Sequence, residues 1–132
     1  MSVFGVRVLM ALAALLLALA TALGAIASHA LGASLDADAL HSFETAVDYQ
    51  FIHSLGLLAV LILAERQRSR PLLIGVALLL AGILLFCGGV YASSLGGPRW
   101  IASVAPTGGV CLIAAWLIFA STLLHQAWRT TR

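Results

Sequence analysis

The segment DYQFIHS, residues 48–54, leads directly into the apolar run LGLLAVLILA, residues 55–64. As a helix, that run covers only about 15 Å, half of a hydrocarbon core about 30 Å thick. Tyr49, Gln50 and His53 must therefore complete the membrane span. Polar side chains at that depth are costly unless they face the protein interior. The segment thus predicts a membrane helix whose polar side chains find partners on other helices.

The composition excludes a soluble domain. Of 132 residues, 62% are hydrophobic and 9% are charged, and the mean hydropathy is +1.08. Soluble domains carry about 25% charged residues, and small ones bury only part of their chain. The net charge of +2 comes from seven scattered arginines, which excludes nucleic acid as a partner. The partner we expect is the lipid bilayer.

Four largely apolar stretches are long enough to cross that bilayer, at about residues 8–28, 43–64, 71–95 and 100–128. Continuous apolar runs without period-2 alternation favour helices. We therefore predict an all-α, integral membrane four-helix transmembrane bundle, with one domain over residues 1–132. A cleavable signal peptide is the alternative for the first stretch, but its apolar core of about 20 residues exceeds the usual length.

The arginines predict the orientation. Six of the seven fall on one side of the predicted spans, and only Arg99 falls on the other; the six are Arg7, Arg66, Arg68, Arg70, Arg129 and Arg132. Cytoplasmic loops carry an excess of basic residues. Both termini are therefore expected in the cytoplasm. In the longest connection, residues 30–42, Ser34 or Asp36 is suited to cap a helix that leads into the second span; a surface turn is the alternative.

The polar residues gather in the predicted outer half of the spans. The candidate cluster consists of His29, Tyr49, Gln50, His53, Tyr91, Pro106, Thr107, Gly108 and Gly109. Two interpretations stay open, a structural hydrogen-bonding clamp and a site for a small molecule, lipid or proton. His29 and Tyr91 are candidate partners for His53, as is a carbonyl near Ala102 that Pro106 frees inside a helix.

No catalytic residue or metal site is expected. His29 and His53 could ligate a haem across two helices, but no carboxylate lies at the depth of His53. No nucleophile elbow, P-loop or zinc motif occurs. We therefore expect no cofactor, with haem as an alternative. Cys87 and Cys111 are interpreted as packing residues, although a bridge between them is geometrically allowed.

Small residues indicate close helix packing or dimerisation. Gly89 and Ser93 form one such pair, and Ala14, Ala18 and Ala22 form a stripe along the first span.

Four segments together resemble the YgdD-type family of small four-helix membrane proteins, a domain of unknown function found in bacteria and, distantly, in mitochondria-bearing cells. They are GAIASHAL (24–31), FETAVDYQFIHSLGL (43–57), GILLFCGGVYASSLGG (82–97) and APTGGVCLIAAWLIF (105–119). The family motifs match Gly24, Ala25, His29, Tyr49, Gln50, His53, Phe86, Gly88, Tyr91, Pro106, Gly108, Gly109 and Trp116. Ser28, Cys87 and Ala105 depart from them. The resemblance implies four spans in the inner membrane, and it implies no activity.

Three functional hypotheses follow. The first is a non-enzymatic accessory or assembly subunit of a larger membrane complex, or a homo-oligomer, favoured by short loops and a surface rich in Gly and Ala. The second is a membrane protein that binds a small molecule, lipid or proton at the polar cluster. The third is a haem- or quinone-binding redox protein.

Overall fold

The computed structural model describes residues 3–66 and 69–130, and its regular structure in these ranges is helical. The elements are α1 (Val3–His29), η1 (Leu31–Ala33), α2 (Ala37–Arg66), α3 (Arg70–Gly82), η2 (Ile83–Cys87), α4 (Gly88–Ser94), α5 (Arg99–Ala102) and α6 (Ala105–Thr130). The segment η1 is a 3₁₀ turn, and η2 is a π-helical turn that joins α3 to α4.

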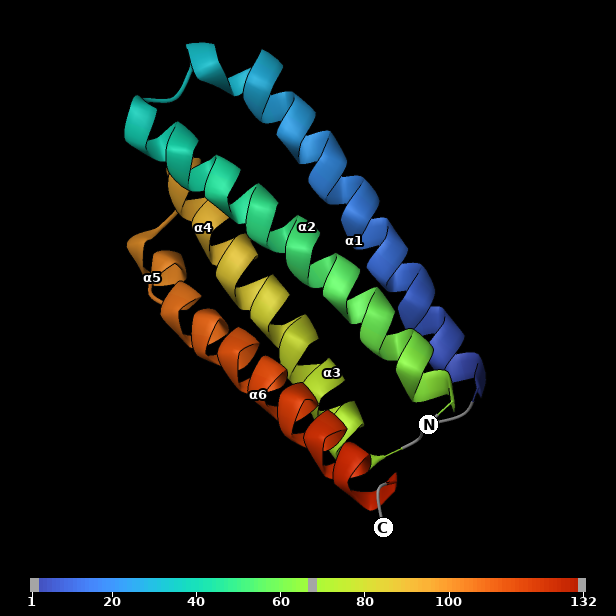
Figure 1. The fold of residues 1–132 in the computed structure, drawn as a ribbon. Coiled ribbons are helices and arrows are strands. Elements are labelled where there is room, and N and C mark those ends of the chain that lie inside the picture. Colours follow the sequence, from blue (N-terminus) through green and yellow to red (C-terminus); the bar gives the residue numbers. More distant parts are fainter. Residues whose placement is uncertain (1–2, 67–68, 131–132) are drawn as a thin grey trace.

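Four helical segments are long and apolar enough to cross a membrane: Val3–Ala33, Ala37–Arg66, Arg70–Ser94 and Trp100–Arg129. This confirms the predicted all-α, four-helix transmembrane architecture. Both ends of the described chain lie at the same end of the helices (Figure 1), as an even number of crossings requires.

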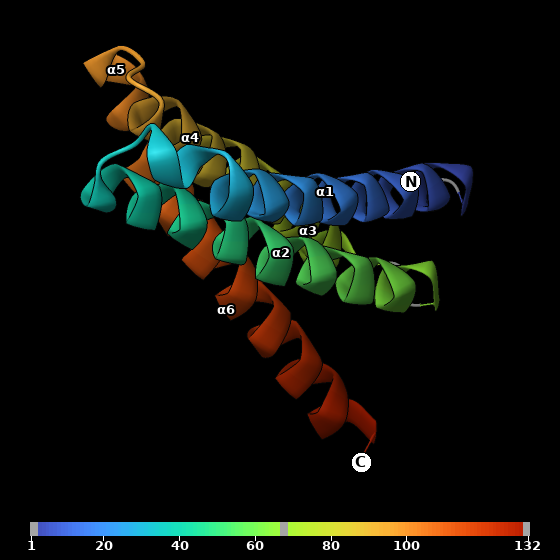
Figure 2. The same ribbon diagram turned by 90° about the horizontal axis from the view of Figure 1, so that it is seen from above.

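The helices pack in chain order. Helix α1 packs against α2, which in turn packs against α3, η2 and α4, while α6 packs against α3 and η2. Figure 1 shows the four spans running side by side, and the perpendicular view in Figure 2 shows α6 turning away from α1 and α2 toward its C-terminal end. Helices α2 and α6 therefore flank η2 without packing closely against each other.

The buried face of α1 repeats every seven residues. It consists of Val6, Ala13, Ala20 and Ala27, each at most 1% exposed. This spacing is typical of a coiled-coil seam, and it lets α1 lie close to α2. The predicted stripe at positions 14, 18 and 22 is exposed instead. The prediction of packing on that face within the molecule was wrong, because alanines occupy both faces of α1 and only the partner helix selects one.

Helix α2 begins six residues before its predicted span. The Asp36 carboxylate accepts a hydrogen bond from Ala39 N at 2.8 Å, which confirms Asp36 as a capping residue. The Ser34 hydroxyl donates to Leu31 O and does not cap α2. Just after the added turns, Glu44 and Asp48 share one face of α2 and are exposed, as expected for a helix that projects from the hydrocarbon.

Helix α6 places large side chains over glycines of the third span. A Cβ atom on Gly82 would lie 2.7 Å from Leu112 Cγ. Conversely, Gly108 of α6 lies against the backbone of η2, where a Cβ atom would be 2.8 Å from Phe86 Cα. Real Cβ atoms do not approach other atoms so closely, so both helix contacts require glycine. These contacts hold α6 on the third span and fix the position of Phe86.

Candidate functional site

Gln50 links three helices. Its side chain is 3% exposed, its Nε2 donates to Leu16 O of α1 at 2.9 Å, and its Oε1 accepts from the Tyr91 hydroxyl of α4 at 3.0 Å. A buried amide needs such partners, because an unmade hydrogen bond costs about 1–3 kcal/mol. Gln50 and Tyr91 thus have the arrangement of a hydrogen-bonding clamp.

His53 lies one turn further along α2 and has different surroundings. The ring is 9% exposed, and its Nδ1 lies 2.7 Å from Tyr49 O. A carbonyl oxygen only accepts hydrogen bonds, so Nδ1 carries the proton. No carboxylate is bonded to the ring within the described ranges, and a lone charge away from water is costly. In the neutral ring, Nε2 is therefore an acceptor, and no described residue hydrogen-bonds to it.

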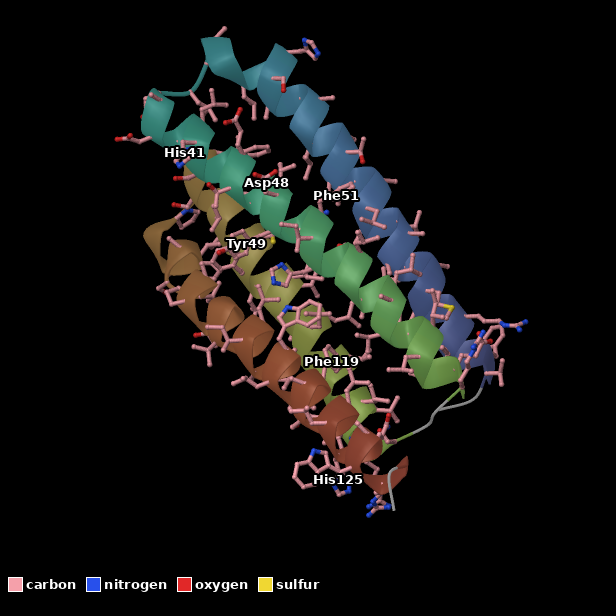
Figure 3. The ribbon with its side chains drawn as sticks, in the orientation of Figure 1. His41, Asp48, Tyr49, Phe51, Phe119 and His125 are labelled. Carbon is pink, nitrogen blue, oxygen red and sulfur yellow. The ribbon has the colours of Figure 1, made fainter. Side chains whose placement is uncertain are left out.

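This side chain lines a groove between α2 and α6, with a volume of about 500 Å³. The α2–α6 groove is formed by Tyr49, Ile52, His53, Phe86, Gly109, Leu112, Ile113 and Trp116. Its rim is open to the surroundings of the protein, since Ile52 and Ile113 are 59% and 64% exposed. Figure 3 shows Tyr49 on the side of α2 that faces α4 and α6.

Aromatic rings surround the imidazole. The Tyr49 ring stacks on His53 at a centroid distance of 5.4 Å, and it also contacts Phe86 at 4.9 Å. The Trp116 ring lies 6.2 Å from His53 and meets Phe119 edge-on. The groove is therefore a mostly apolar slot with aromatic walls, and the polar side chains that line it are His53, Tyr49 and Trp116. Of these, His53 is itself buried.

The walls depend on two local features. A Cβ atom on Gly56 would lie 2.5 Å from Trp116 Cη2, so this glycine leaves room for the indole to lie against α2. The π-helical turn η2 carries Phe86, and such turns occur frequently at functional sites. Gly56 thus lets a side chain of α6 pack directly on α2, and η2 supplies Phe86 to the wall of the groove.

The groove lies about half-way through the molecule. Ser42 and Ser94 line a common cavity at the end opposite the chain termini. Eleven positions separate Ser42 from His53, which corresponds to about 16 Å along α2. The exposed Asp48 lies only five positions before His53, so the placement of the polar residues in the outer half of the spans stays a prediction.

His29 does not belong to the cluster. It is exposed at the end of α1, level with the start of α2. His53 lies sixteen residues beyond Ala37, about 24 Å away along the helix. The two histidines therefore cannot bind each other or ligate one haem. Within residues 3–66 and 69–130, no group of three His, Cys, Asp or Glu side chains is placed to hold a metal. Cys87 and Cys111 are free thiols.

The Pro106 segment contributes only in part. Helix α5 ends at Ala102 and α6 begins at Ala105, so Pro106 occupies the first turn of a helix, where it removes no helical bond. The predicted free carbonyl inside a continuous fourth span was wrong for this reason. Pro106 and Thr107 are exposed, Gly108 packs on η2, and only Gly109 lines the groove.

Several groove residues were not among the predicted site residues, namely Ile52, Phe86, Leu112, Ile113 and Trp116. In the sequence they resemble ordinary residues of apolar spans. The available signal was that Phe86 and Trp116 are the aromatic positions of the motifs that resemble the YgdD-type family.

A family model described as a protein of unknown function, DUF423, matches residues 23–109. The chain belongs to this family. In the DUF423 protein described here, the matched range contains Gln50, Tyr91, His53 and Phe86, whereas Leu112, Ile113 and Trp116 follow it. The clamp and most of the groove thus fall within the part of the chain that the family model covers.

Curated relatives are similar over most of their length. A UPF0382 membrane protein of Staphylococcus saprophyticus is 37% identical over 112 residues, covering 85% of this chain and 92% of the relative. One from Haemophilus influenzae is 36% identical over 99 residues, 75% and 79% of the two chains. The UPF0382 inner membrane protein YgdD of Escherichia coli is 32% identical over 97 residues, 74% of each. No solved structure matches. With the four membrane-length helices, these relatives confirm the expected multi-pass inner-membrane protein.

Proposed function

We propose that this DUF423 protein is a non-enzymatic membrane protein that binds a small, lipid-soluble molecule in the α2–α6 groove. The observation that carries the proposal is His53, a buried side chain that lines a mostly apolar groove and whose Nε2 has no hydrogen-bond partner among the described residues. A volume of about 500 Å³ lies in the range of small-molecule sites. A ligand that dissolves in the bilayer can enter laterally at this depth.

The contrast between Gln50 and His53 supports a division of roles. The amide of Gln50 uses both its ends in bonds to α1 and α4, so it has a structural explanation. His53 bonds only to the carbonyl of its own helix, and this bond joins no second helix. A structural clamp therefore explains Gln50, whereas His53 is available to bind a ligand.

The other hypotheses have less support. The role of an accessory or assembly subunit stays a prediction, because lipid alone satisfies the apolar side chains that α1 and α6 expose. A haem in the groove would have His53 as an axial ligand and no second histidine within reach, because His29 lies at the end of α1.

A pair of Gly→Leu variants tests the proposal. Gly109 lines the groove, and a Cβ atom there meets only Phe86, at 3.8 Å. The Gly109→Leu side chain should therefore fill the groove without disturbing the helices. Gly88 is the matched control, because it is exposed and a Cβ atom there meets nothing within 4 Å.

Each protein is purified from membranes in native lipid particles, and the small molecules retained are identified by mass spectrometry. We expect one species to be retained by the unaltered protein and by Gly88→Leu, and to be lost from Gly109→Leu. The proposal is wrong if the unaltered protein retains nothing beyond bulk lipid, or if the species remains on a correctly folded Gly109→Leu.

A further inference from the structure

Resting on the proposed function, we infer the chemical class of the ligand: a lipid-soluble aromatic compound with a free hydroxyl group, of the phenol or hydroquinone type, whose O–H donates to His53 Nε2. Two observations on the same groove support it, the contact of His53 Nδ1 with the Tyr49 carbonyl oxygen and the arrangement of the aromatic side chains around the imidazole.

The tautomer of the His53 imidazole determines which ligand group can hydrogen-bond to it. Because Nδ1 donates to Tyr49 O at 2.7 Å, the neutral ring offers only a lone pair at Nε2. A ligand must supply a donor there. Ketone, quinone, ester and ether oxygens have no hydrogen to give, so they would bury Nε2 without a partner. An unmade bond of this kind costs about 1–3 kcal/mol.

Charged donors are disfavoured by the location. Ammonium groups would meet Nε2 beside a side chain that is only 9% exposed, where an unpaired charge is costly. Neutral hydroxyl groups carry no such penalty. The donor is therefore an uncharged O–H.

The walls favour an aromatic ring next to that hydroxyl. The Tyr49 and Phe86 rings lie with their centroids 4.9 Å apart, and the Trp116 ring lies 6.2 Å from the imidazole. Aromatic pairs at such distances add about 0.5–1.5 kcal/mol beyond burial. An aliphatic alcohol can donate to Nε2 but lacks this contribution. An alkyl tail would leave past the exposed Ile52 and Ile113 into the lipid.

The test compares two ligands that differ in one hydrogen-bond donor, 4-nonylphenol and its methyl ether 4-nonylanisole. Full-length protein in phosphatidylcholine nanodiscs carries Trp100→Phe and Trp128→Phe, so that emission reports Trp116 alone. We expect the phenol to bind roughly tenfold more tightly than the ether. His53→Phe keeps a ring in place but removes the acceptor, and should reduce the ratio to about one. His41→Phe, at an exposed position on the same helix, should keep it.

The outcomes separate the two claims. If neither compound binds, the proposed function fails and the inference with it. If both bind equally to the protein with His53, the groove is a ligand site and the hydroxyl assignment is wrong. If the phenol keeps its advantage in His53→Phe, the assignment to Nε2 is wrong. The comparison of phenol and ether needs no variant at His53, so it stands even if that variant does not fold.

Discussion

Within residues 48–54, neighbouring polar side chains have different surroundings. Asp48 is exposed, Gln50 is bonded to two other helices, and His53 lines the groove. The residues are two to five positions apart, so the rotation of the helix directs them to solvent, protein interior and groove. Neighbouring residues over about one and a half turns of α2 therefore differ in role, because Gln50 belongs to the clamp and His53 lines the groove.

Gln50→Leu tests the clamp. The change removes both interhelical bonds and leaves the Tyr91 hydroxyl without its partner, so we expect a loss of about 1–2 kcal/mol in the free energy of unfolding. Reversible unfolding in mixed detergent micelles measures it. Because Tyr91→Phe removes one of the same bonds, the double variant should lose less than the sum of the single losses. Strictly additive losses would show that the two side chains do not cooperate.

At the level of single residues, the sequence predicted which polar residues take part better than it predicted which residues they bond to. Tyr91 was a candidate from its position near the end of an apolar span, and it does bond to a residue of the segment. His29 was a candidate for similar reasons, yet it lies at the end of α1. The difference depends on how far α2 extends beyond its apolar run, which the Asp36 cap determines and hydropathy does not show.

At the level of elements, glycines determine how closely the helices approach. The Leu112 side chain packs on Gly82 and the Trp116 side chain packs on Gly56, while Gly108 lies on the backbone of η2. The small residues of the third span predicted close packing in general. The π-helical turn and the break between α5 and α6 have no comparable pattern in the sequence, because both depend on tertiary contacts. The π-helical turn carries Phe86, which lines the groove, so the groove itself could not be predicted.

Gly108→Ala tests the contact between α6 and η2. Its Cβ atom would lie 2.8 Å from Phe86 Cα, and backbone atoms cannot move aside as a flexible side chain can. We expect a destabilisation of about 1–3 kcal/mol. Gly88→Ala is the control, since that position is open and alanine favours the helix. Thermal unfolding in micelles compares them. Equal stability of the two variants would contradict the close approach of α6 to η2.

At the level of the whole molecule, the four spans do not close tightly on all sides. The third span lies between α2 and α6, and α6 diverges toward its C-terminal end (Figure 2). Apolar runs predicted the number of spans, and the resemblance predicted the family. Neither predicts an open side, because the spacing of α2 and α6 depends on which side chains meet between them. The groove is a property of this arrangement.

The orientation in the membrane stays a prediction with a direct test. Arg7, Arg66, Arg70 and Arg129 lie near the helix ends on the side that carries both termini, so this side should face the cytoplasm. A fluorescent protein fused to the C-terminus should fluoresce, and alkaline phosphatase fused there should be inactive. A non-fluorescent fusion together with an active phosphatase fusion would show that the termini lie outside the cytoplasm.

The most direct test of the groove is nitrogen NMR of the His53 ring in protein labelled with ¹⁵N-histidine and held in lipid nanodiscs, with the signal assigned by its loss in His53→Phe. We expect a protonated Nδ1 and an unprotonated Nε2. The Nε2 signal should shift when 4-nonylphenol is added and should not shift when 4-nonylanisole is added. A protonated Nε2, or an Nε2 signal that the phenol leaves unchanged, would contradict these expectations.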